Sequence, residues 1–251
     1  DLFTELHARS SFSFLRGASQ PEDLVRRAAE LGYQAIALLD HMGVQGSARA
    51  HFTAQQHGLR ALVGATAELP DPQSQIAHLE IPLLVKNRTG YQNLCRLLTD
   101  LHCADNASSS TTSPSQGTES GAEIPLPSGF CPQTKGLVAL LTPESLPDST
   151  KTNLLETAIW LRDTFGPENL YLTLTRHHVR GEERRNRLLI DLAGHLKLPL
   201  LASNAPLFAR RRDRLLADAF TCLRHHTTLD QAGTLLEANP ERHLKSPSQV
   251  T

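Results

Sequence analysis

The stretch SQPEDLVRRAAELGYQAIALLDH, residues 19–41, indicates the fold because it joins a helix pattern directly to a strand pattern. Ser19 and Glu22 have the spacing of a capping box, and the residues that follow predict a helix over about Pro21–Leu31. The next run, Ala35–Leu39, is entirely apolar, which is typical of a strand buried on both faces. The segment therefore predicts a helix that precedes a central strand of a parallel sheet.

The same alternation of apolar runs and amphipathic stretches continues on both sides of this segment. The apolar runs predict strands at Phe3–His7, Ala35–Leu39, Ala61–Val63, Ile81–Val85, Leu137–Leu141, Leu170–Leu174 and Leu198–Ala202. The amphipathic stretches predict further helices over about Val44–His57, Tyr91–Leu101, Leu154–Thr164, Glu182–Leu196 and Arg210–Leu223. Repeated strand–helix units predict an α/β fold with a parallel sheet, and they leave open whether the sheet is a closed barrel or open and doubly wound.

Composition and length exclude several classes of protein. The chain has 251 residues, of which 39% are hydrophobic, and this length suits one large domain or two small ones. Its 25 basic residues balance 26 acidic ones, so no global field draws it to nucleic acid or membrane. Four cysteines without a CxxC pair predict reduced thiols. With no signal peptide and no apolar run near the ~18 residues of a membrane span, we expect a cytoplasmic protein.

One segment differs from the rest in composition. From about Cys103 to Lys135 the chain is rich in Ser, Thr, Gly and Pro, and it cannot bury enough apolar surface to offset the entropy of ordering. We expect a disordered insert within a single domain over residues 1–251, because strand–helix units resume after it. The start at Asp1, without a methionine, and the polar end at Thr251 predict a domain of a longer polypeptide.

Polar side chains follow several predicted strands at the point where each strand ends. His7 and Arg9 follow the first strand, Asp40 and His41 the second, and His177 the sixth. The carboxyl ends of parallel strands meet at one edge, and imidazole with carboxylate suits zinc, manganese or iron. For each of His7, His41 and His177 taken alone, a structural role is the favoured interpretation. Together they predict a present or former metal site.

Several motifs resemble the polymerase-and-histidinol-phosphatase (PHP) domain, and more narrowly the N-terminal PHP domain of bacterial error-prone DNA polymerases, relatives of the C-family alpha subunit. The motifs are Glu5-Leu-His-Ala-Arg-Ser-Ser-Phe-Ser-Phe-Leu-Arg-Gly-Ala-Ser, Leu39-Asp-His-Met-Gly, Val63-Gly-Ala, Gly90-Tyr-Gln-Asn-Leu-Cys and Leu198-Pro-Leu-Leu-Ala-Ser-Asn. The resemblance spans nearly the whole chain except the insert. It implies a distorted seven-stranded βα barrel whose active members hold a cluster of metal ions that cleaves phosphate esters.

The resemblance also implies a ligand set, of which this chain retains only a part. His7, Asp40, His41 and His177 (or His178) stand at ligand positions. Other ligand positions are changed to Arg9, Thr66, Ala205 and Leu207, and the cysteine or histidine expected after Leu141 is missing. Glu68 lies two residues beyond Thr66, and we expect its side chain to point elsewhere.

These losses predict that the site does not catalyse hydrolysis. A site for two or three metal ions needs several protein donors for each ion and an open position for water. Arg9 adds a permanent positive charge where the cations would lie. A single weakly bound zinc or manganese ion at His7, His41 and His177 remains compatible with the residues that are left.

Arginines near the same strand ends predict a basic patch that would bind nucleic acid or phosphate. The patch consists of Arg9, Arg16, Arg176, Arg180, Arg210, Arg211 and Arg212. Salt bridges to the remainder of a larger polymerase are the alternative use of these side chains.

The resemblance favours one function over two others. In the favoured hypothesis the chain is a degenerate PHP scaffold of an error-prone DNA polymerase in DNA repair and translesion synthesis, and is itself inactive. The Mg²⁺-dependent polymerase chemistry would then lie beyond Thr251. Implied partners are the remaining polymerase domains, DNA through the parent enzyme, the sliding clamp and mutagenesis-complex proteins. The alternatives are an active metal-dependent phosphoesterase or 3′–5′ exonuclease, and a free-standing phosphate-binding module.

Overall fold

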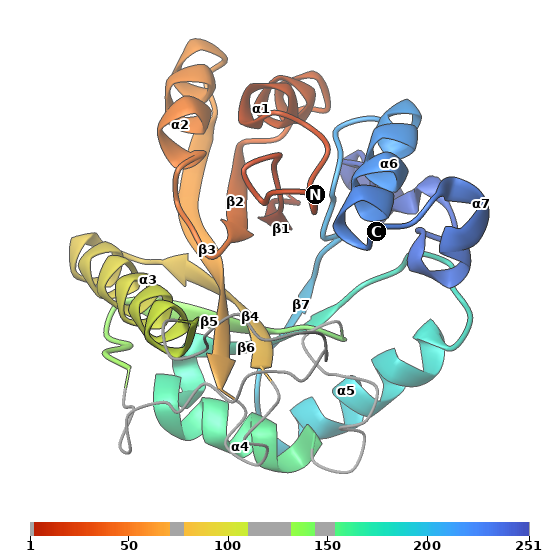
Figure 1. Ribbon diagram of the computed structural model, residues 1–251. Helices are drawn as coiled ribbons and strands as arrows, with labels where there is room; N and C mark the ends of the chain where they lie inside the picture. The colour runs from red at the N-terminus through yellow and green to blue at the C-terminus, as the bar shows by residue number, and fades with distance from the viewer. Residues whose placement is uncertain (1–2, 71–77, 110–131, 144–153, 251) are drawn as a thin grey trace.

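The protein folds as a seven-stranded sheet that curls into a half-barrel with helices on its outside (Figure 1). The computed structural model describes residues 3–70, 78–109, 132–143 and 154–250. The strands lie side by side in chain order, β1 to β7. They are β1 (Glu5–Ala8), β2 (Ala35–His41), β3 (Arg60–Pro70), β4 (His78–Val85), β5 (Leu137–Leu141), β6 (Leu170–Leu174) and β7 (Leu200–Ala202). The α/β barrel-type fold expected from the sequence is confirmed.

The sheet is not entirely parallel, which corrects the expectation from the strand–helix pattern. Strand β4 pairs antiparallel with both β3 and β5, whereas the remaining pairs are parallel. Only seven residues, 71–77, join β3 to β4. A parallel crossover needs a dozen or more residues, so this connection can only return the chain antiparallel.

Eight α-helices occur in the described part of the chain. They are α1 (Pro21–Glu30), α2 (Ser47–Gln56), α3 (Arg88–Ser109), α4 (Leu154–Phe165), α5 (Glu182–Leu196), α6 (Arg214–Arg224), α7 (Leu229–Ala232) and α8 (Pro247–Val250). Helix α3 continues to Ser109, so the predicted insert begins too early at Cys103, and residues 110–131 lie outside the described residues. None of the described helices has the length and apolar character needed to cross a membrane.

The predicted capping box of α1 is wrong. The N-cap position is Gln20, and no side chain caps the helix. The Ser19 hydroxyl instead accepts a hydrogen bond at 2.8 Å from the backbone N–H of Ala209, 190 residues away. A tertiary contact therefore uses the side chain that the local pattern assigned to the helix.

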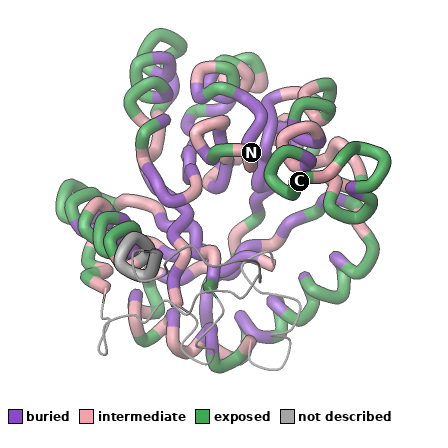
Figure 2. The backbone as a smooth tube through the Cα atoms, in the orientation of Figure 1, coloured by how far each residue is buried: buried purple, intermediate pink, exposed green. Residues whose placement is uncertain are grey.

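The core lies between the sheet and the helices that cover it, and the strands form its most buried part (Figure 2). Every residue of β2 except His41 is buried, as its apolar run predicts. Pairing of β2 with β3 sets Asp40 beside Ala65 and His41 beside Thr66. Pairing of β3 with β4 sets Glu68 opposite Glu80. These two registers bring one imidazole and two carboxylates to the same end of the sheet.

Candidate metal centre

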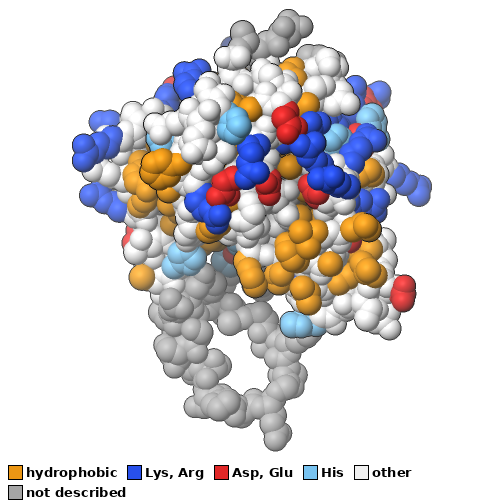
Figure 3. Space-filling view, turned by 90° about the horizontal axis from the view of Figure 1, so that it is seen from above, with side chains coloured by type: hydrophobic (Ala, Val, Ile, Leu, Met, Phe, Trp, Pro, Cys, Tyr) orange, Lys and Arg blue, Asp and Glu red, His pale blue; other side chains and the backbone are white. Residues whose placement is uncertain are grey.

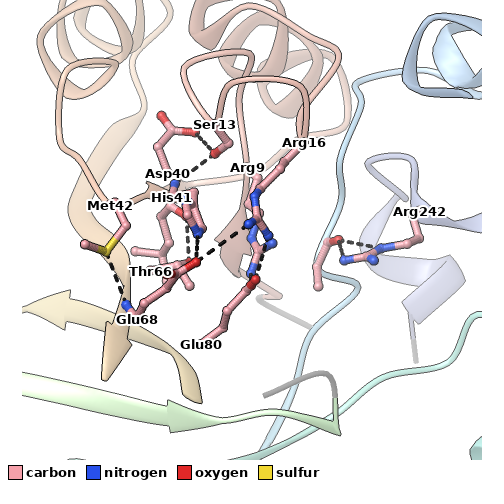
Figure 4. Close-up of polar contacts among 12 residues, drawn as sticks. Arg9, Ser13, Arg16, Asp40, His41, Met42, Thr66, Glu68, Glu80 and Arg242 are labelled. Atoms are coloured by element: carbon pink, nitrogen blue, oxygen red, sulfur yellow. Dashed lines mark hydrogen bonds and ion pairs between the residues drawn. The ribbon is translucent and has the colours of Figure 1, made fainter. Parts of the chain in front are cut away.

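His41, Glu68 and Glu80 form the candidate metal centre (Figure 4). Each offers one donor atom, and these atoms lie within 4.8 Å of one another. Imidazole nitrogen and carboxylate oxygen are donors that suit zinc or manganese. Among the described residues this is the one group of three such donors. The three residues could therefore hold a metal ion, and their geometry leaves the identity of that ion open.

The orientation of Glu68 corrects the expectation that its side chain points away. Strand β3 extends to Pro70, well beyond the predicted end at Val63, so Thr66 and Glu68 lie on the same face of one strand. Glu68 Oε1 lies 2.7 Å from His41 Nε2. This hydrogen bond with His41 is the main cause that lowers the pKa of Glu68.

Two arginines from the segment after β1 contact the carboxylates of the cluster. Arg9 Nη2 lies 2.9 Å from Glu80 Oε2, and Arg16 Nη1 lies 2.6 Å from Glu80 Oε1. Arg16 Nη2 also lies 3.6 Å from Glu68 Oε1. Burial raises the pKa of Glu80, but the charges of Arg9, Arg16 and His41 outweigh it and leave that pKa below its usual value. Two guanidinium groups thus balance the two carboxylates.

Asp40 precedes His41 in the chain, but its carboxylate forms hydrogen bonds with the loop after β1 and not with the cluster. The carboxylate is buried and accepts hydrogen bonds from the Ser10 backbone N–H at 2.7 Å, the Ser10 hydroxyl at 2.8 Å and the Ser13 hydroxyl at 2.8 Å. The backbone N–H of His41 donates to the same Ser13 hydroxyl at 3.0 Å. Asp40 therefore anchors the loop that carries Arg9 and Arg16.

His7 is almost completely buried, with 1% of its surface exposed. Neither of its ring nitrogens has a hydrogen-bond partner in the described part of the chain. Burial lowers the pKa of His7 well below its usual value, and the charges of Arg9, Arg242 and His177 lower it further. The imidazole is consequently neutral, and its surroundings disfavour added positive charge.

His177 is also buried and takes part in hydrogen bonds of its own. Its Nε2 lies 2.7 Å from the backbone oxygen of Asn204, and its backbone N–H donates to Glu182 at 2.7 Å. His178 is exposed. Of the four residues predicted to bind metal, only His41 belongs to the described cluster, and a metal role for His7, Asp40 and His177 stays a prediction.

The positions at which the resemblance indicated lost ligands have structural roles in this chain. The Thr66 hydroxyl donates to the Leu39 backbone oxygen at 3.0 Å. The backbone oxygen of Ala205 accepts hydrogen bonds from Arg242 Nε at 3.2 Å and Nη2 at 3.1 Å, and Leu207 is buried. Arg242 was not singled out in the sequence because its role depends on a contact 37 residues away.

The arginines of the predicted basic patch are mostly paired with carboxylates of the same chain. Arg210 contacts both oxygens of Glu30 at 2.8 Å, and Arg211 lies 2.5 Å from Glu241. The side chain of Arg212 is 83% exposed, and Arg176 and Arg180 are also exposed. Acidic side chains lie among the basic ones on the face seen in Figure 3. Contact of these arginines with nucleic acid stays a prediction.

The fold and the strand-end cluster define the class of protein. The profile of the PHP domain family matches residues 5–177, and the chain belongs to that family. It is similar to the error-prone DNA polymerase of Anaeromyxobacter dehalogenans, with 36% identity over 252 residues, which cover 99% of this chain and 20% of the relative. The error-prone DNA polymerase of Pseudomonas aeruginosa is 33% identical over 244 residues, covering 97% of this chain and 21% of the relative. The chain thus spans about a fifth of the length of these relatives.

Two solved structures share the fold at low sequence identity. A protein of Bifidobacterium adolescentis, provisionally named a metal-dependent phosphoesterase, has a TM-score of 0.52 and 15% identity, and the match covers 80% of this chain and 86% of that protein. An amidohydrolase of Chromobacterium violaceum, determined with bound sulfate and no metal, has a TM-score of 0.53 and 16% identity over the same shares of the two chains. At this identity the likeness shows the fold alone.

Proposed function

We propose that this chain is a structural PHP domain of an error-prone DNA polymerase that acts in DNA repair and translesion synthesis, and that it does not hydrolyse phosphate esters. The similarity to error-prone DNA polymerases over 97–99% of the chain supports the first part. Polymerase chemistry, Mg²⁺, DNA, the sliding clamp and mutagenesis-complex proteins would belong to the longer polypeptide.

The contact of Arg9 and Arg16 with the candidate metal centre carries the second part of the proposal. Both oxygens of Glu80 already bind a guanidinium, and Glu68 binds His41. A divalent ion would have to break these bonds or lie beside fixed positive charges. Two unit charges 4 Å apart repel by about 4 kcal/mol in a partly buried site, and a divalent ion doubles that cost.

The small number of metal-ligand atoms in the cluster also argues against hydrolysis by this chain. Hydrolysis by metal ions needs a water or hydroxide held on an ion that keeps an open coordination position. The cluster offers three donors, and each is engaged in a hydrogen bond or ion pair within the chain. The residues therefore do not fit a catalytic metal centre of two or three ions, and we assign no hydrolytic step to this chain.

An active metal-dependent phosphoesterase is the second candidate, and one observation favours it. His41, Glu68 and Glu80 converge within 4.8 Å, as ligands of an ion do. If Arg9 and Arg16 turned away, the three donors would be available to a single ion. The two candidates therefore differ in whether the arginines or a metal ion balance the carboxylates.

Metal content and hydrolysis measured on the same preparation decide between them. The chain is dialysed against zinc and manganese, freed of loose ions and examined by elemental analysis, and then assayed on single-stranded DNA for 3′–5′ exonuclease activity. We expect no stoichiometric metal and no cleavage. Tight binding of one or more ions together with metal-dependent cleavage would refute the proposal.

A pair of variants makes the test specific. In Arg9→Met/Arg16→Met the carboxylates lose their guanidinium partners, and we expect zinc or manganese to bind and to raise the unfolding temperature. Arg210→Met serves as the matched control, because its ion pair with Glu30 lies outside the cluster. The control is expected to bind no more metal than the unmodified chain.

A further inference from the structure

The last part of the fold exposes five large apolar side chains. Figure 3 shows apolar side chains gathered on the side of the molecule where α6 and α7 lie. Helix α6 contacts α7, and α7 contacts the 3-10 turn Gly233–Leu235. We call the following residues the leucine surface: Leu215 (77% exposed), Leu216 (46%), Leu223 (61%), Leu229 (55%) and Leu235 (47%).

Helix α6 carries apolar side chains on its outer side as well as on its inner side, where Ala217 and Cys222 are buried. Leu215, Leu216 and Leu223 face outward, whereas the carboxylate of Asp218 is buried and pairs with Arg214 at 3.3 Å. A surface helix of a monomer normally buries its apolar stripe and exposes its charges. Single exposed leucines are common, but a contiguous group of this kind marks an interaction site.

The border of the leucine surface describes the partner that would fit it. Arg212 and Arg224 are exposed at or near the two ends of α6, and Asp230 is exposed on α7. Interfaces commonly have an apolar centre and a polar rim with complementary charges. The matching surface would therefore be apolar at its centre and bear mainly carboxylates where it meets Arg212 and Arg224.

We infer that the leucine surface is the docking site for another domain of the same polypeptide. This inference rests on the proposed function, because it takes the chain to be part of an error-prone DNA polymerase. The chain accounts for 20% of the length of its relative from A. dehalogenans, so most of such a polymerase consists of other domains. One of those domains covers the five leucines, and a second copy of this chain is the competing occupant.

Hydroxyl-radical footprinting of the full-length polypeptide tests the inference without altering the protein. Leucines that are equally exposed in the structure serve as internal standards. Leu229 (55% exposed) is compared with Leu188 on α5 (50%), and Leu235 (47%) with Leu155 on α4 (43%). We expect Leu229 and Leu235 to be modified about tenfold more slowly than their standards, as residues in an interface core are. Equal rates for the members of each pair would overturn the inference.

Two further arms identify the occupant. In the full-length Leu215→Ser/Leu223→Ser variant, modification of Leu229 should rise to the rate of Leu188, because the docked domain is released. Protection that disappears on dilution of the unmodified polypeptide would assign the surface to a second copy and overturn the inference. Failure of the proposed function would be seen in a different experiment, as metal binding and DNA cleavage by the chain. Neither result alters the modification rates of the leucines.

Discussion

Replacing Arg9 by methionine tests the energetic role of the arginine–glutamate contacts at the candidate metal centre. The substitution keeps the apolar stem of the side chain and removes only the guanidinium, which lies 2.9 Å from Glu80 Oε2. The Arg9 side chain is 11% exposed and that of Glu80 is 28% exposed, so the ion pair is largely shielded from water. The change therefore leaves a partly buried carboxylate with one cationic partner fewer.

The size of the effect follows from burial and from the partner that remains. Removing one member of a buried ion pair costs about 3–5 kcal/mol, because the other charge is left uncompensated. Glu80 keeps Arg16 at 2.6 Å and has some access to water, both of which reduce the cost. We therefore expect Arg9→Met to lower the free energy of unfolding by about 2 kcal/mol at pH 7.

Urea denaturation of four proteins measures this contribution. They are the unmodified chain, Arg9→Met, Glu80→Gln and the double variant, which form a thermodynamic cycle. The cost of Arg9→Met should largely vanish once Glu80 carries no charge. Arg212→Met, at a side chain that is 83% exposed, should change stability by less than about 0.5 kcal/mol. A cost of Arg9→Met that is equally small, or the same with and without the Glu80 charge, would refute the reasoning.

The pH dependence gives an independent check on the same pair. The pKa of Glu80 lies below its ordinary value of 4.5 in the folded chain. The stability contributed by its pairing is thus present above pH 4.5 and is lost as the pH falls through the folded pKa. The difference between the unmodified chain and Arg9→Met should accordingly shrink in acid. A difference that stays constant to pH 3 would show that it does not come from the charge of Glu80.

Three further predictions concern His7, a pair of glycines and Ser19. Burial keeps the pKa of His7 well below 6.5. The stability that comes from its neutral form is therefore present above pH 6.5 and is lost as the pH falls below that value. In urea titrations, His7→Leu should lose less stability than the unmodified chain between pH 7 and pH 5. Gly17→Ala would place its Cβ 2.1 Å from the Ser10 backbone oxygen and should destabilise the loop around Asp40 by more than about 2 kcal/mol. Gly194→Ala, with no atom within 4 Å of its Cβ, should instead stabilise α5 by about 0.5–1 kcal/mol, and equal effects of the two glycine changes would contradict the packing argument. Ser19→Ala should cost about 1–2 kcal/mol through the lost bond to Ala209, with an unchanged helix signal in circular dichroism.

Several elements were predictable from the sequence because neighbouring residues decide them. Strands β5 and β6 and helix α5 have the predicted bounds, and β2 is as buried as its apolar run indicates. The antiparallel course of β4 was not among them, because the predicted strands Ala61–Val63 and Ile81–Val85 leave 17 residues, 64–80, for a crossover, whereas the observed strands leave only seven. The motifs of residues 5–19 and 39–43 indicated the family, which the match to the PHP domain confirms.

The composition of the candidate site, in contrast, depends on how distant strands pair. Glu80 was not predicted as a site residue, and the Glu68 side chain was expected to point away from the site. The local sequence around a carboxylate does not indicate which distant residues it will contact. The β3–β4 register sets these two residues opposite each other, and the loop after β1 then brings in Arg9 and Arg16 from 71 and 64 residues away. The sequence by itself thus determined the family and the positions of most strands and helices. Only the tertiary structure decided which charges meet, because strand pairing sets the separation of charges that are distant in the chain, and electrostatic energy depends on that separation.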